Sequence, residues 1–363
     1  MTMRQNKTRR FVGTAAALLV LVAGAACGQE PAEDIASLPY DTEFIYHSDS
    51  HCGEVEPVIA PEFFLPEAEA AITEEFDLGV LHCTWLQAIF SGTRSVKADV
   101  GMIDAPDWEE QAREWADSVT TDDFIPVEGL GDIALLGPTN ADTDEHESYG
   151  LELYVFEGNM KFEASAESIT DTGDVLFRGS TLASAEASLV AMAEVFLKSV
   201  GAADHTAAGP EPAAAGEAAA APEICADSLL GSWTPADDSD AWGSDLESLR
   251  QCHFTDGEDQ LWVSAESFAA PSSGGMSAGE FASWWASARD GIESTAFEAG
   301  DEARYRFEET DGRLAVHLLV RSGNLVIEAR FIGPLDDGAA AEEAAAAAAS
   351  AIGADLDALL EKQ

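Results

Sequence analysis

The chain contains one β-hairpin pattern twice, over residues 151–164 and 316–329. Each copy has two runs rich in apolar and aromatic residues, separated by Gly158-Asn159 in the first copy and Gly323-Asn324 in the second. Glycine adopts a positive φ at no steric cost and asparagine tolerates it better than most residues, so both pairs suit a tight turn between paired strands. The repeat therefore predicts two related units.

Other positions also correspond between the two halves. Matched residues lie 169 positions apart before the hairpin and 165 apart at its turn, which places extra residues of the first half near 138–147. The matched residues are Cys83 and Cys252, Trp115 and Trp284, and Gly131-Asp132 and Gly300-Asp301.

Hydrophobic periodicity predicts the same order of elements in both halves. In the first half we expect helices over 61–75 and 183–200, strands over 83–90, 96–100 and 133–136, and an amphipathic helix with Trp108, Ala112, Trp115, Ala116 and Val119 on one face. In the second half we expect strands over 252–254, 261–263 and 303–307, a helix over 339–360, and an amphipathic helix presenting Phe281, Trp284, Trp285, Ala288 and Ile292. The helical spacing of the tryptophans favours core packing over a carbohydrate-binding platform.

These elements predict an α+β fold with two tandem copies of a sandwich of helices on an antiparallel sheet. The modules are expected over residues 41–200 and 223–363. Residues 201–222, which are mostly Ala, Gly, Pro and Glu, cannot bury much apolar surface and are interpreted as a flexible linker.

The first 26 residues have the layout of a lipoprotein signal peptide, with basic residues at 4–10 and an apolar stretch that ends in small residues before Cys27. The stretch resembles a bacterial lipobox, in which the cysteine is acylated and becomes the new N-terminus, although Gly24 stands where leucine is favoured. We therefore predict acylation of Cys27, a polar tether over 27–40 and a lipid anchor on the extracellular face of the cell membrane, with secretion as the alternative.

Four cysteines remain in the exported chain, and an oxidising compartment favours disulfides between them. Because the repeat matches the two halves, we pair Cys52 with Cys83 and Cys225 with Cys252. The alternative is a metal site, since histidines adjoin Cys52, Cys83 and Cys252. Close ligand pairs such as Cys-x-x-Cys are absent from the sequence, so we expect disulfides and no metal.

The composition excludes some classes of partner. The chain has 68 acidic and 18 basic residues, for a formal net charge of −50. Nucleic acids and anionic lipid surfaces require basic patches, so we expect neither as a binding partner. The acidity indicates a solvated, salt-tolerant surface, with capture of cations or basic partners as the alternative.

A family resemblance is carried by Cys52, Cys83-Thr84-Trp85, the Gly131-Asp132 turn and the hairpin. With these features the chain resembles a widespread group of actinobacterial cell-envelope lipoproteins of unknown function. That group is in turn similar to the disulfide-bonded extracellular sensor domains of mycobacterial Ser/Thr kinases and to PsbP-like sandwiches. The second half departs from the pattern, because Cys252-His253-Phe254 replaces Cys-x-Trp. The resemblance implies a fold and a location, but no activity.

No catalytic motif stands out in the sequence, whether of a metalloprotease, an α/β-hydrolase, a P-loop or a dinucleotide-binding site. The acidic loops with Asn140, Asp142 and Asp144, and with Asp238 and Asp240, lack the Gly and distal Glu of an EF-hand and are interpreted as solvated, with weak calcium binding as the alternative. His317 lies in a predicted strand and either faces solvent or fills a gap in the core.

We therefore predict a non-enzymatic, lipid-anchored envelope protein that needs no cofactor and whose two modules bind a ligand or a protein partner. An acidic cell-wall or extracellular hydrolase is the alternative, and its catalytic carboxylate pair would have to be identified from a measured separation.

Overall fold

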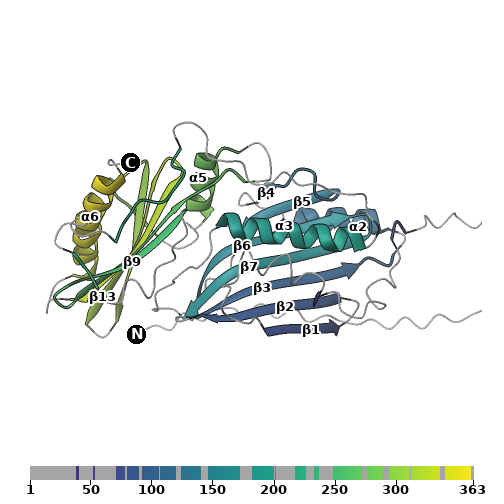
Figure 1. Ribbon diagram of the computed structural model, residues 1–363, viewed down its shortest axis with the longest axis horizontal. Helices are drawn as coiled ribbons and strands as arrows, with labels where there is room; N and C mark the ends of the chain where they lie inside the picture. The colour runs from purple at the N-terminus through teal and green to yellow at the C-terminus, as the bar shows by residue number, and fades with distance from the viewer. Residues whose placement is uncertain are drawn as a thin grey trace, which may run out of the picture. The chain divides into compact units, whose positions relative to one another are not determined.

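The structure is a computed structural model (Figure 1). It describes residues 38–40, 52–53, 71–77, 80–89, 92–105, 107–119, 124–139, 146–171, 182–199, 201, 217–225, 233–236, 248–271, 276–288, 294–310, 312–335 and 340–360. These residues form two seven-stranded sheets whose paired strands are antiparallel, together with four helices, so the predicted α+β class is confirmed.

Sheet 1 has the strand order β1-β2-β3-β7-β6-β5-β4. Its strands are β1 (Ala71–Asp77), β2 (Val80–Ile89), β3 (Gly92–Met102), β4 (Ile125–Pro126), β5 (Ile133–Pro138), β6 (His146–Glu157) and β7 (Met160–Asp171). Sheet 2 has the order β11-β12-β13-β14-β10-β9-β8. Its strands are β8 (Thr234–Pro235), β9 (Leu249–Asp256), β10 (Asp259–Ser267), β11 (Thr295–Ala296), β12 (Glu302–Thr310), β13 (Arg313–Ser322) and β14 (Leu325–Pro334). If β8 is taken as the counterpart of β1, the two sheets have the same topology.

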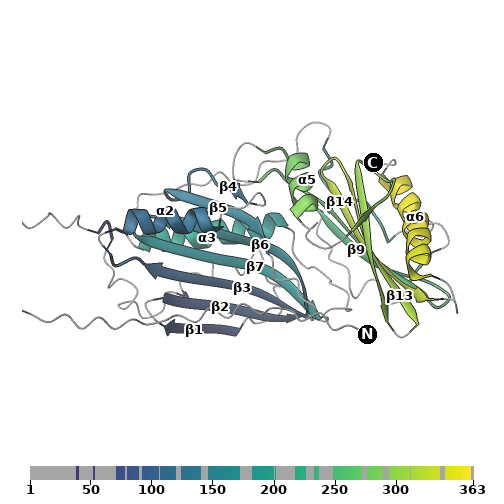
Figure 2. The same cartoon turned by 180° about the vertical axis from the view of Figure 1, so that it is seen from behind.

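Each sheet carries a long helix on one face, which we call its first face (Figures 1 and 2). Helix α3 (Leu182–Ser199) contacts β6 and β7, and α6 (Ala341–Leu360) contacts β12 and β13. The first faces hold the main cores, because the buried apolar side chains of these strands and helices belong to the same clusters. Burial of this apolar surface is the main favourable contribution to folding.

A shorter helix packs on the opposite face of each sheet, which we call the second face. In α2 (Trp108–Val119), the Trp115 ring packs edge-on against Phe156, with 4.3 Å between ring centroids. Helix α5 (Ala278–Ala288) contacts β13 and β14, and its Trp285 is fully buried. A capping box starts α5, since Ser277 Oγ accepts the Glu280 N–H and the Glu280 carboxylate accepts the Ser277 N–H. The predicted core role of these two tryptophans is confirmed.

Two expectations about the elements need correction. The helix expected over 61–75 is wrong at its C-terminal end, because Ala71–Asp77 is the edge strand β1. Residues such as Ile72 and Thr73 favour strands, and β1 pairs with β2 along its whole length.

The extra residues of the first half lie not only between β5 and β6, as expected, but also between β2 and β3. Cys83 pairs with Ala98, whereas Cys252 pairs with Val263, which is four residues nearer in sequence.

The repeated Gly-Asp and Gly-Asn turns bind each other in both halves. The Asp132 carboxylate accepts the Gly158 N–H at 2.9 Å, and the Asp301 carboxylate accepts the Gly323 N–H at 2.7 Å. Gly158 and Gly323 have φ values of 54° and 58°, which favour glycine. The predicted two-residue hairpin turn is therefore confirmed in both copies, and each is held by the turn that precedes β5 or β12.

A buried asparagine in each hairpin turn fastens a distant segment of backbone, and we call this pair the asparagine clamps. Asn159 Oδ1 accepts the Tyr40 N–H at 2.9 Å, while its Nδ2 donates to the carbonyls of Tyr40 and Ile103. Asn324 repeats the arrangement with Ala218, at 2.8 Å in both directions, and with the Phe268 carbonyl at 2.9 Å.

The segment held by Asn324 belongs to the stretch interpreted as a linker. Residues 202–216 lie outside the described residues, but Ala221 is buried and Ile224, just beyond the stretch, lies in the core of the second half. Residues 217–222 therefore pack with the second half.

The two halves also contact each other through Glu266 of β10, which is 1% exposed. Its carboxylate accepts a hydrogen bond from Tyr149 Oη at 2.7 Å and one from the Leu182 N–H at 2.8 Å. Leu182 is the first residue of α3, so a side chain of the second half caps a helix of the first. The ring of Trp285 packs edge-on against Tyr149, with centroids 4.9 Å apart.

Candidate functional site

The predicted disulfides are both formed. Cys52 and Cys83 are joined with 5.6 Å between their Cα atoms, and Cys225 and Cys252 with 5.4 Å. The first bond joins a segment that precedes sheet 1 to strand β2. The second joins a segment that precedes sheet 2 to strand β9, the counterpart of β2.

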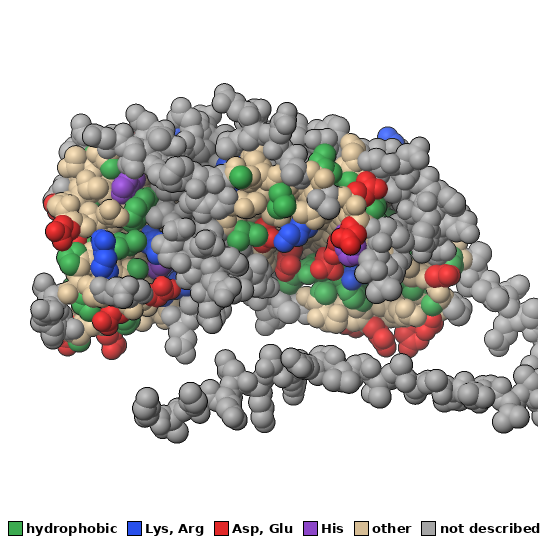
Figure 3. All heavy atoms as spheres, turned by 90° about the horizontal axis from the view of Figure 1, so that it is seen from below, with side chains coloured by type: hydrophobic (Ala, Val, Ile, Leu, Met, Phe, Trp, Pro, Cys, Tyr) green, Lys and Arg blue, Asp and Glu red, His purple; other side chains and the backbone are tan. Residues whose placement is uncertain are grey.

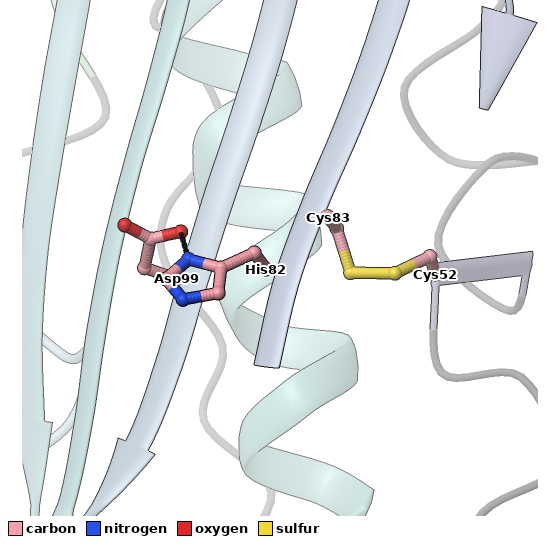
Figure 4. The surroundings of a disulfide bond; sticks show 4 residues. All are labelled: Cys52, His82, Cys83 and Asp99. Atoms are coloured by element: carbon pink, nitrogen blue, oxygen red, sulfur yellow. Dashed lines mark hydrogen bonds and ion pairs between the residues drawn. A yellow bond between two sulfur atoms is a disulfide. The ribbon is translucent and has the colours of Figure 1, made fainter. Parts of the chain in front are cut away.

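The alternative of a metal site at the cysteines is not supported by the geometry. Successive strand residues point to opposite faces, so His82 points away from the disulfide at Cys83 (Figure 4). His82 Nδ1 lies 2.7 Å from Asp99 Oδ1 instead. Among the described residues, no group of three or more His, Cys, Asp or Glu side chains is placed to hold a metal ion.

Several sequence-predicted positions lie outside the described residues. These are Cys27, His51, Asn140, Asp142, Asp144, Asp238, Asp240 and Ile292. The expectations of acylation and of solvated acidic loops therefore stay predictions.

The second face of sheet 2 carries a line of basic and aromatic side chains across five strands, which we call the basic row. In order along the row, these residues are His253 on β9, Trp262 on β10, Arg330 on β14, His317 on β13 and Arg306 on β12. Each is the direct cross-strand partner of the next, so the row spans about 19 Å at the usual strand spacing. In Figure 3, several basic side chains and histidines, blue and purple, lie among acidic and apolar ones at the left of the view.

The basic row is half-buried. His253 and Arg330 are each 8% exposed, whereas Trp262, His317 and Arg306 are of intermediate exposure. The rings of His253 and Trp262 stack in parallel, with centroids 4.5 Å apart and 2° between their planes. The stack fixes the two rings relative to each other at the β9–β10 end of the row.

More arginines lie next to the basic row on the same face. Arg304, two residues before Arg306, pairs with Glu302, and burial lowers the Arg304 pKa. Arg321 Nε also reaches Glu302, at 3.2 Å. With Arg313, which alternates with His317 and Arg321 along β13, five of the chain's 18 Lys and Arg residues lie on one face of one sheet. Glu302, Glu308 and Glu328 lie on the same face, so charges of both signs are close together there.

The equivalent positions of sheet 1 differ in charge. The counterparts of the basic row, in the same order, are Thr84, Lys97, Ser165, Glu152 and Gly137. A β-carbon at Gly137 would overlap the Phe124 ring, so an aromatic ring occupies the place of the Arg306 side chain. In the neighbouring row Glu163 and Glu328 are equivalent, whereas Asp99 corresponds to Ser264 and Leu135 to Arg304. The arginines of sheet 2 therefore stand where sheet 1 has uncharged residues.

The second face of sheet 1 perturbs one carboxyl. Burial raises the pKa of Glu152 to about 7, and the negative charges of Glu163 and Glu167 raise it further. The Tyr154 hydroxyl opposes this shift, because it donates a hydrogen bond to Glu152 at 3.2 Å. Glu167, only 5% exposed, pairs with Lys97 at 3.2 Å. Carboxyls with a pKa near neutrality are found at functional sites more often than elsewhere, although structural networks also produce them.

The basic row was not predicted from the sequence. Of its five residues, His317 was considered there as a strand residue that either faces solvent or fills a gap in the core, and His253 only as a neighbour of Cys252. The five residues come from five strands spread over 78 positions, and only the register brings them into line. The one local signal was the alternation of Arg304 and Arg306, which places both side chains on one face of a strand.

Among the described residues, no helix is both long and apolar enough to cross a membrane. A scan against protein-family models and searches of curated proteins and of solved structures found no match to this chain.

Proposed function

We propose that this chain is an exported, lipid-anchored envelope protein that acts by binding rather than by catalysis, through two copies of one helices-on-sheet module. The observation that supports it best is the different chemistry of the two second faces at equivalent positions, where Ser165, Glu152 and Gly137 of sheet 1 correspond to Arg330, His317 and Arg306 of sheet 2. Core positions suffice to specify the repeated fold. The difference in charge at partly exposed positions therefore suits two surfaces with different binding tasks.

Localisation to an oxidising compartment is compatible with the two disulfides. Acylation of Cys27 would anchor the chain through its lipid, with residues 28–37 as part of the tether. Labelling an expressing actinobacterial host with a fatty-acid probe tests this step. We expect label and membrane fractionation for the wild type, and loss of both for Cys27→Ser; an unlabelled wild-type protein in the medium would contradict the anchor.

The binding role is tested by native mass spectrometry of the exported protein from residue 28 onwards, without reductant. We expect an adduct that leaves on denaturation, and a rise in melting temperature when the released compound is added back. A bare protein that turns over envelope substrates would instead contradict a non-enzymatic role.

A hydrolase is the second candidate, and the Glu152 environment is the observation that favours it. Glu152 is paired with Ser165 in the register, so Glu163 and Glu167 are its diagonal neighbours on β7. Diagonal pairs have Cβ atoms about 7–8 Å apart, comparable with the carboxyl separation of inverting glycosidases. Hydrolysis of a cell-wall glycan by the wild type but not by Glu152→Gln would establish this candidate, with Lys198→Gln as a control on an exposed helix position.

A further inference from the structure

We propose that the basic row of sheet 2 is a binding site for a polyol or sugar that carries a phosphate or carboxylate group. The inference rests on the proposed binding function and adds the ligand class and the residues that recognise it.

The arginines supply the recognition of the anionic group. Arg330 and Arg306 flank His317, because each is its cross-strand neighbour. They are two strand spacings apart, about 10 Å, which is within the combined reach of two arginine side chains that converge on one oxyanion. Guanidinium groups bind phosphate and carboxylate through paired, charge-assisted hydrogen bonds, and His317 between them offers a further ring nitrogen.

The charge near the basic row is mixed, in contrast to the acidity of the whole chain. Charges further away than about 8 Å are largely screened at physiological ionic strength. An anion at the basic row would therefore respond to Arg330 and Arg306 and to the carboxylates two residues from each on the same face, Glu328 and Glu308, and little to the distant carboxylates that dominate the net charge of −50. Direct contacts with the guanidinium groups have to supply the affinity.

A hydroxyl on the ligand is indicated by Glu328. It lies two residues from Arg330 on β14 and on the same face, in the row next to the basic row. Its Oε1 atom is buried and has no hydrogen-bond partner among the described residues. A buried carboxylate oxygen without a partner is costly, so rotation of the half-buried Glu328 side chain toward a ligand hydroxyl would be favoured.

The stacked rings of Trp262 and His253 continue the row on the side away from Arg306. Each ring covers one face of the other, so the more exposed Trp262 offers its remaining apolar ring atoms to the C–H groups of a polyol or sugar. The two arginines thus suit an anionic group on the ligand. The Glu328 carboxylate suits a hydroxyl, and the Trp262 ring suits a carbon chain.

Isothermal titration calorimetry on the disulfide-bonded protein from residue 28 onwards tests the site. Glycerol 3-phosphate and glucuronate are the two small probes, inorganic phosphate is the comparator without a hydroxylated carbon chain, and poly(glycerol phosphate) represents an envelope polymer. We expect glycerol 3-phosphate or glucuronate to bind more tightly than phosphate. Tighter binding of the polymer than of the small probes would identify an envelope polymer as the source of the ligand, and the reverse a free metabolite.

The variants separate the parts of the site. Arg330→Gln and Arg306→Gln should each weaken binding about tenfold or more, as expected for a lost charge-assisted contact. Glu328→Ala should weaken binding of glycerol 3-phosphate but not of phosphate, because it removes an acceptor for the hydroxyl and also a negative charge near the anion. Lys97→Gln is the matched control, because Lys97 occupies the position of Trp262 in sheet 1, and it should have no effect. Arg306 is the more exposed arginine, so its variant keeps the test valid if Arg330→Gln fails to fold.

The inference is overturned if none of these anions binds, or if the arginine variants bind like the wild type. The proposed function fails separately from it. A native ligand retained by both arginine variants would refute this site but keep the binding role, whereas anion binding at the row together with substrate turnover would keep the site and refute a purely binding protein.

Discussion

Replacement of Asn324 by alanine removes one asparagine clamp and tests how much it stabilises the fold. The side chain is 2% exposed and makes three hydrogen bonds to backbone groups, at 2.8, 2.8 and 2.9 Å. At about 1 kcal/mol for each bond, with an added cost for backbone groups left buried and unpaired, the loss should be about 3–4 kcal/mol. The bonds of Asn159 are longer, at 2.9–3.3 Å, so Asn159→Ala should cost less, about 2–3 kcal/mol.

Urea unfolding followed by far-ultraviolet circular dichroism measures both losses. Ser322→Ala, one position before the turn and only half-buried, is the control and should change stability by no more than about 0.5 kcal/mol. Asn324→Asp provides a sharper test, since its carboxylate can still accept the Ala218 N–H but opposes two carbonyl oxygens.

The aspartate variant should therefore be less stable than the alanine variant at neutral pH and recover in part in acid, where the protonated carboxyl donates a hydrogen bond. A loss below about 1 kcal/mol for Asn324→Ala, or an aspartate variant as stable as the wild type, would show that the clamp does not hold the 217–222 segment as described.

Three further predictions concern other parts of the fold. Replacement of both Cys52 and Cys83 by alanine should lower the free energy of unfolding by about 3–4 kcal/mol, because their bond closes a 31-residue loop; an unchanged midpoint in urea would contradict this. The folded-state pKa of Glu152 is about 7, against an ordinary value of 4.5, so the native state holds this proton more tightly than the unfolded chain, and the resulting stability is complete below pH 4.5 and lost as the pH rises to about 7. Glu152→Gln should flatten this part of the pH–stability curve and be more stable than the wild type at pH 8 by about 1–2 kcal/mol after allowance for solvent screening, and parallel curves would refute it. A double-mutant cycle of Glu266→Ala and Tyr149→Phe should give a coupling energy of about 1 kcal/mol, whereas additive losses would mean that this contact does not join the halves.

The sequence was most informative where structure depends on local signals. The Gly158-Asn159 and Gly323-Asn324 turns were predictable because a two-residue loop between apolar runs has few alternatives. The disulfide pairing followed from the repeat, since corresponding cysteines occupy corresponding places in both halves. The end of the first expected helix was wrong because its Ala and Glu content suggested a helix, while pairing with β2 favoured a strand.

The candidate site depends on information that a single sequence does not display. The β2–β3 and β5–β6 hairpins of sheet 1 are each four residues longer than their counterparts, so equivalent positions cannot be matched at one constant offset. A register error of one residue would move His317 or Arg330 to the opposite face. The contact of Glu266 with Leu182 likewise joins residues 84 positions apart that share no sequence motif.

If Cys27 is acylated as proposed, the asparagine clamp at Asn159 would also set the length of the tether between the lipid and the first module. Tyr40 lies thirteen positions after Cys27, which limits the fully extended tether to about 45 Å. Were the clamp to open, the next described attachment would be the disulfide at Cys52, and the limit would rise to about 90 Å. A side-chain amide in a hairpin turn would thus govern how far the modules extend from the membrane, and a pulling force on the lipid would act on that turn before it reached either sheet.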